Sequence, residues 1–89
     1  MLAAHVQLSP EALFQEIGGE GVILDLVSST YFGLDEVGVR FWQLLQDTSD
    51  FRAAFATLLS EYDVEPGRLE TDLDELVKQL VNAGLASID

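Results

Sequence analysis

The chain has 89 residues, 48% of them hydrophobic and 22% charged, which is the composition of a folded domain. Sixteen acidic residues against four basic ones give a net charge of −12, which excludes the basic surface needed to bind nucleic acid and disfavours binding to an anionic membrane. The absence of cysteine excludes disulfides and thiolate metal sites. Neither a secretory signal nor an apolar run of roughly 20 residues is present. We therefore expect one cytoplasmic domain spanning residues 1–89.

The first third of the chain predicts three strands joined by tight turns. Residues 13–17 are short and partly alternating, and residues 18–21 (Gly-Gly-Glu-Gly) have the composition of a turn. Residues 22–27 form a strongly β-prone run, and a third strand is predicted at residues 29–34. Together they predict an antiparallel meander between about residues 12 and 34.

The hydrophobic pattern changes to a helical period at Asp35. Asp35 is a favourable N-cap, because its short carboxylate can accept a hydrogen bond from the first turn of a helix. A second helix is predicted over about residues 50–62, with Thr48 or Ser49 as its cap. The pattern thus predicts two consecutive helices directly after the strands.

A third helix is predicted from Pro66, whose missing N–H is not needed at the first helical position. Gly84 suits the left-handed residue that ends a helix, so the helices lie between about residues 35 and 83 and an extended tail covers residues 84–89. Three strands followed by three helices predict an α+β fold in which the helices cover one face of a small sheet.

No catalytic constellation is evident in the sequence. His5 is the only histidine and lies near the chain terminus, and Asp72 with Glu75 is read as a solvated flank of the third helix in preference to a metal pair. Residues 18–21 lie between two strands, so they do not form a phosphate cradle at a helix start. We therefore expect no enzyme activity, no metal and no cofactor.

The third strand has the features of an exposed edge that accepts a partner. Residues 29–34 contain no proline and no charged residue to blunt such an edge, so they could accept a peptide by β-augmentation. Thr30, Phe32 and Leu34 share one face of the strand, and Phe32 is expected to point toward the helices. The alternatives are that these are ordinary sheet residues, or that the edge pairs with a second copy of the chain.

Several segments, in this order, resemble the PqqD-like family over roughly residues 6–88. They are Gly-Val-Ile-Leu-Asp-Leu at residues 21–26, Thr-Tyr-Phe-Gly-Leu-Asp-Glu-Val-Gly at 30–38, Phe-Trp-Gln-Leu-Leu at 41–45, Glu-Tyr-Asp-Val at 61–64, Asp72, and Ala-Gly-Leu at 83–85. This family consists of recognition elements for the precursors of ribosomally synthesised, post-translationally modified peptides. The resemblance implies a winged helix-turn-helix fold that binds a leader peptide as an added strand and presents it to a leader protease, a cyclase or another modifying enzyme.

The resemblance also implies where the leader lies, in a groove between the third strand and the third helix. The implied peptide-binding residues are Ser29, Thr30, Tyr31, Phe32, Gly33 and Leu34 on the strand, and Leu69, Asp72, Leu73, Leu76 and Gln79 on the helix. Asp72 matches an acidic position typical of the family and could hold a basic residue or a backbone N–H of the leader, or act as a structural cap. Asp72 and Gln79 flank the apolar stripe of the helix on one side, and Val77 and Val81 flank it on the other. We expect the side with Asp72 to face the leader peptide.

Within the family, residues 30–38 look more like the lasso-peptide-type or generic members than like those of pyrroloquinoline quinone synthesis. The latter more often carry Leu-Asn before the first helix, whereas Asp35 stands here. We therefore favour a stand-alone lasso-peptide-type module. A chaperone for the quinone precursor and a structural dimerisation domain are the alternatives.

Overall fold

The computed structural model of the chain describes residues 5–88. The elements in chain order are β1 (Val6–Leu8), β2 (Ala12–Ile17), β3 (Glu20–Asp25), β4 (Thr30–Leu34), α1 (Glu36–Thr48), α2 (Phe51–Glu61), α3 (Pro66–Asn82) and β5 (Ala86–Ile88). β2, β3 and β4 form an antiparallel sheet in that order. The predicted α+β arrangement, a three-stranded sheet followed by three helices, is confirmed.

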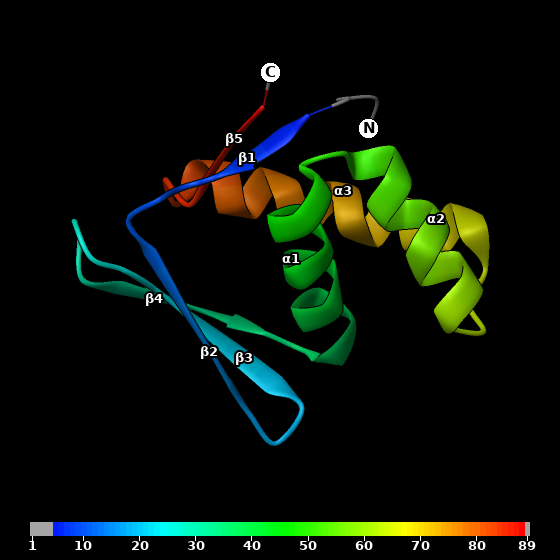
Figure 1. Ribbon diagram of the computed structural model, residues 1–89, viewed down its shortest axis with the longest axis horizontal. Helices are drawn as coiled ribbons and strands as arrows, with labels where there is room; N and C mark the ends of the chain where they lie inside the picture. The colour runs from blue at the N-terminus through cyan, green and yellow to red at the C-terminus, as the bar shows by residue number, and fades with distance from the viewer. Residues whose placement is uncertain (1–4, 89) are drawn as a thin grey trace.

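Helix α1 lies at the centre of the fold, with the three-stranded sheet on one side and α2 on the other (Figure 1). It begins where predicted, because the carboxylate of Asp35 accepts a hydrogen bond of 2.8 Å from the N–H of Gly38. Phe41 of α1 packs edge-to-face on Phe51 of α2, with ring centroids 5.8 Å apart. Trp42 stacks on Phe14 of β2 at 6.2 Å. One helix therefore joins the sheet and the other helices into a single core.

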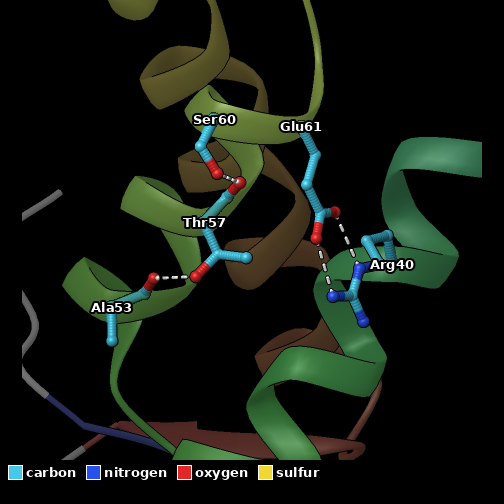
Figure 2. Close-up of polar contacts among 5 residues, drawn as sticks. All are labelled: Arg40, Ala53, Thr57, Ser60 and Glu61. Atoms are coloured by element: carbon cyan, nitrogen blue, oxygen red, sulfur yellow. Dashed lines mark hydrogen bonds and ion pairs between the residues drawn. The ribbon is translucent and has the colours of Figure 1, made fainter.

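A polar contact on the surface also ties α1 to α2. The guanidinium of Arg40 donates two hydrogen bonds of 2.8 Å to the carboxylate of Glu61 (Figure 2), and this lowers the pKa of Glu61 below its usual value. The hydroxyl of Thr57 donates to the carbonyl of Ala53 one turn earlier within α2. Because the ion pair is partly solvated, it fixes the orientation of α2 relative to α1 more than it adds to the stability of the fold.

The start of α2 differs from the prediction. Thr48 is the last residue of α1, and Ser49 ends that helix in the left-handed region with φ of 56°. The cap of α2 is Asp50, whose carboxylate accepts from the N–H groups of Arg52 and Ala53. The prediction that Thr48 or Ser49 caps α2 was wrong because α1 continues through Thr48, so only Ser49 and Asp50 lie between the two helices.

The end of α3 follows the prediction closely. Gly84 has φ of 77°, and its N–H bonds the carbonyl of Val81 at 3.1 Å, while the N–H of Leu85 reaches back to Leu80 at 2.9 Å. This pair of bonds is a Schellman motif, and it places Leu85, which is 1% exposed, against the last turn of the helix. The chain is thereby redirected into β5.

A second sheet, formed by β1 and β5, was not anticipated from the sequence. Val6 pairs with Ile88 and Leu8 with Ala86 in antiparallel register, so residues 86–88 of the predicted extended tail are a paired strand; residue 89 lies outside the described residues. Val6 is fully buried, and its N–H bonds the carbonyl of Ser49 at 2.8 Å. The strands β1 and β5 therefore lie beside the C-terminal part of α3 and pair with each other, not with β4 (Figure 1).

At Gly21 the sheet lies close against Val39 of α1. A methyl group at this position would lie 2.7 Å from Cγ2 of Val39 and 2.8 Å from Cε1 of Phe14. We predict that Gly21→Ala lowers the free energy of unfolding by about 1–3 kcal/mol, because both neighbours are packed and must shift. Urea unfolding followed by circular dichroism measures this.

The control is Gly33→Ala, because a methyl group at Gly33 meets no atom within 4 Å. We expect it to unfold at the urea concentration of the unchanged chain or above it. Equal stability of Gly21→Ala and the unchanged chain would contradict the close packing of α1 on β3.

Candidate functional site

The outer edge of β4 is open: within residues 5–88, β4 pairs with β3 alone. The tail forms β5 and pairs with β1, so it does not seal this edge. An open edge presents backbone N–H and C=O groups that can bond an incoming strand.

The sheet register identifies which groups face outward. The N–H of Leu26 bonds the carbonyl of Glu11 across the β2–β3 pair, which sets the direction of backbone groups along β3. Since these groups alternate sides along a strand, Asp25, Ile23 and Gly21 direct theirs toward β4. Their partners in β4 are Thr30, Phe32 and Leu34, whose N–H and C=O groups are thus engaged with β3. Tyr31 and Gly33 are left facing the open edge.

Side chains of β4 alternate as the sequence predicted. Leu34 is 6% exposed and Phe32 is half-buried on the face that meets the helices. Tyr31, which is 78% exposed, and Gly33 lie on the opposite face. The backbone groups that are free to bond a guest therefore belong to residues whose side-chain positions face away from the core.

A groove of about 750 Å³ runs between β4 and α3, beside the open edge. Its lining comes from β4, the start of α1, the loop before α3 and one side of α3. The residues are Phe32, Gly33, Leu34, Asp35, Val37, Gly38, Val64, Glu65, Arg68, Leu69, Asp72, Leu73, Leu76 and Gln79. Most of this surface is apolar, so the groove suits the side chains of an extended peptide whose backbone bonds the edge.

All five residues singled out on the third helix line the groove. Leu69 and Leu73, at 4% and 2% exposed, form its floor, and the half-buried Leu76 forms part of its wall. Val77 is fully buried in the core. The side of α3 that faces the groove is therefore the one carrying Asp72 and Gln79.

Asp72 is in the second turn of α3, where it caps nothing. The cap is Glu65, whose carboxylate accepts a hydrogen bond of 2.6 Å from the N–H of Arg68. The carboxylate of Asp72 lies 3.9 Å from Nε of Arg68, and both side chains are largely exposed. Such a pair is weak in water, so Asp72 keeps the capacity to bind a cation or an N–H at the rim of the groove.

Three of the predicted strand residues lie outside the groove. Ser29 is not in the strand: it sits in the turn before β4 with φ of 59°, and its N–H bonds the carbonyl of Asp25 at 2.7 Å. The hydroxyl of Thr30 pairs with that of Ser28 at 2.7 Å. Tyr31 borders the open edge through its backbone but points its ring to the other face. The prediction that Ser29 belongs to the strand was wrong, because nothing in the composition of residues 28–30 indicates the left-handed turn at this position.

Sequence reasoning missed the groove residues that lie near the starts of α1 and α3. Val37 follows the cap of α1, and Val64 with Glu65 precedes α3. Val64 is 38% exposed although it is apolar. The one available signal was an apolar residue in an otherwise polar link, followed by Pro66.

The opposite edge of the sheet, β2, is a poorer candidate. Among the described residues, those lining the groove include none from β2. A strand added there would gain backbone bonds without the groove that lies between β4 and α3. The structure thus offers one edge at which backbone and side-chain binding coincide.

The profile of the family described as Coenzyme PQQ synthesis protein D (PqqD) matches residues 20–86, which is more than half of the chain. The chain belongs to the PqqD family. None of the curated proteins matches this PqqD-family chain. The resemblance inferred from the sequence is confirmed.

Two solved structures are similar to this PqqD-family chain. One is TbiB1 in complex with the TbiA(beta) leader peptide, with 33% identity, a TM-score of 0.83, and coverage of 91% of this chain and 94% of that one. The other is a lasso peptide synthetase B1 complexed with the leader peptide, with 31% identity, a TM-score of 0.81, and coverage of 94% and 99%. Both are therefore peptide-binding proteins of the same fold and nearly the same length.

No helix in the described range is long and apolar enough to cross a membrane. Residues 5–88 also contain no group of three histidine, aspartate or glutamate side chains placed to hold a metal ion. The groove beside β4 is therefore the site on which we base a function.

Proposed function

We propose that this chain binds the leader segment of a ribosomally made precursor peptide as a strand added to β4. The observation that carries the proposal is the coincidence of an open strand edge with an apolar groove beside its second half, from Phe32 to Leu34. The two similar structures are complexes with leader peptides, which supports the same ligand class here.

The geometry gives each part of the guest a role. Backbone groups of the guest bond the outward N–H and C=O of Tyr31 and Gly33, which gives affinity with little dependence on sequence. The guest residue between those two points its side chain inward, past Phe32 and toward Leu76. Selectivity arises there, because an apolar side chain is desolvated in the groove whereas a charged one would lose its hydration.

The charge of the site favours a basic segment. Three of the four charged residues in the lining are acidic, namely Asp35, Glu65 and Asp72, and the whole chain carries −12. Asp35 and Glu65 already accept hydrogen bonds from helix N–H groups. Asp72 is the carboxylate best placed to meet a Lys or Arg of the leader.

Presentation to an enzyme completes the proposed role. The chain would hold the leader while a separate leader protease, cyclase or other modifying enzyme acts on the rest of the precursor in the cytoplasm. The chain itself would act as a recognition module with no catalytic step. A lasso-peptide pathway is favoured over quinone synthesis, because one of the similar structures is a lasso peptide synthetase B1.

The backbone prediction concerns Tyr31→Pro. Proline removes the outward N–H of Tyr31 and places a ring where the guest backbone must lie, so we expect at least tenfold weaker binding, equivalent to about 1.4 kcal/mol. Proline is tolerated on an edge strand whose N–H faces solvent, so the fold should persist. The measurement is fluorescence anisotropy with a fluorescein-labelled synthetic leader, taken from a short precursor gene to be sought beside the gene for this chain.

Tyr31→Ala is the matched control, since it removes the side chain and keeps the N–H. We expect its affinity within about threefold of the unchanged chain. Equal affinities for Tyr31→Pro and Tyr31→Ala would rule out strand addition at β4, and no binding by the unchanged chain would rule out the proposed function.

The charge prediction concerns Asp72→Lys. Reversing this charge places a cation at the rim of the groove, so we expect about tenfold weaker binding of the same leader peptide in low salt and a smaller loss at high salt. Glu75→Lys makes the same change of charge on α3 outside the groove lining and should stay within about threefold. Equal losses for the two variants would show that only the net charge matters.

A further inference from the structure

Gly33 has no structural reason to be glycine in the free protein. Its φ is not in the left-handed region that favours glycine, and a methyl group there would meet no atom within 4 Å. Glycine weakens a strand, because its flexible backbone loses more conformational entropy on folding and because it has no side chain to pack. Gly21 differs, because a methyl group there would meet two side chains within 2.8 Å.

The space beside Gly33 is part of a second hollow. On the face of the sheet away from the helices, a hollow of about 530 Å³ is lined by apolar side chains of Val22 and Ile17 and by the carboxylate residue Glu20. Val22 is the direct cross-strand partner of Gly33 and is 39% exposed, and Ile17 is 69% exposed. Because Gly33 has no side chain, nothing on β4 separates Val22 from the open edge at this point.

This outer hollow borders the groove at the edge of β4, because Gly33, Leu34 and Asp35 line both. A guest strand on that edge therefore passes between them, with its side chains alternating from one to the other.

The pairing geometry specifies the guest residue involved. We take the guest strand as antiparallel to β4, which is the more common orientation of paired strands. In such a pair, two residues that exchange N–H and C=O bonds lie opposite each other with side chains on the same face. The guest residue bonded to Gly33 thus directs its side chain onto the outer face, across the glycine and toward Val22. Neighbouring strands are about 4.8 Å apart, so only a long side chain reaches Val22 from the guest position.

We propose that the outer hollow is a second binding subsite, which takes a bulky apolar side chain from the leader residue paired with Gly33. This inference rests on the proposed function and deepens it: one leader residue is selected in the groove, and its neighbour is selected on the opposite face of the sheet. Glu20 and Asp35 at the rim exclude an acidic residue from this position.

The test is Gly33→Val, with binding measured by anisotropy of the labelled leader peptide described above. Valine keeps the backbone N–H and C=O and favours a strand, so the urea midpoint should not fall, but its side chain fills the path to Val22. We expect at least tenfold weaker binding, with Gly33→Ala intermediate. Gln15→Val is the matched control, because Gln15 pairs with the other side of Val22 and is exposed on the same face; it should bind within twofold of the unchanged chain.

An alanine scan of the leader peptide on two proteins adds a readout that a general loss of affinity would not produce. At one leader position, replacement by alanine should weaken binding to the unchanged chain at least fivefold. The same replacement should weaken binding to Gly33→Val less than twofold. Binding of Gly33→Val within twofold of the unchanged chain would overturn the second subsite and leave strand addition intact, provided that Tyr31→Pro still weakens binding. Absence of binding by the unchanged chain would overturn both proposals.

Discussion

Two residues, Tyr31 and Gly33, direct their backbone N–H and C=O groups away from the sheet, and the proposed function depends on this unpaired edge. A backbone edge in water is already solvated, so exposure alone gives no preference for a peptide. The preference comes from the groove beside it, where apolar surface of Phe32 and Leu76 can be removed from water at the same time. Backbone bonding and apolar burial thus act on the same guest.

The rest of the fold holds that edge open. The Schellman turn at Gly84 directs the tail into β5, and β5 pairs with β1 at the far end of α3. The N-cap at Asp35 starts α1 directly after β4, so the helix approaches the sheet at Gly21 without covering the outer side of β4. A short connection and two well-defined helix ends therefore leave one strand available without exposing the core.

Local patterns in the sequence predicted much of this arrangement. The alternation of Phe32 and Leu34 gave the inner face of β4, and Pro66 and Gly84 marked the ends of α3, because each of these signals acts within a few residues. Features that depend on distant segments were not predictable in this way. The pairing of Val6 with Ile88 joins segments from opposite ends of the sequence, and the groove side of α3 is set by the packing of Val77 in the core.

Two positions show where sequence reasoning was limited by backbone conformation. Ser29 belongs to a turn because its φ is positive, and a serine gives no sign of that. Gly33 was predicted as a member of the strand, but its significance depends on comparing it with Gly21 in three dimensions. Glycine at one site permits close packing within the protein, and at the other it leaves space for a partner.

Amide hydrogen exchange, followed by NMR with and without the leader peptide, tests strand addition most directly. The account predicts that the amides of Tyr31 and Gly33 exchange rapidly in the free chain and become strongly protected in the complex, while those of Thr30 and Phe32, already bonded to β3, change little. Bound peptide with unchanged exchange at Tyr31 and Gly33 would show that the leader binds without joining the sheet, and would contradict the account.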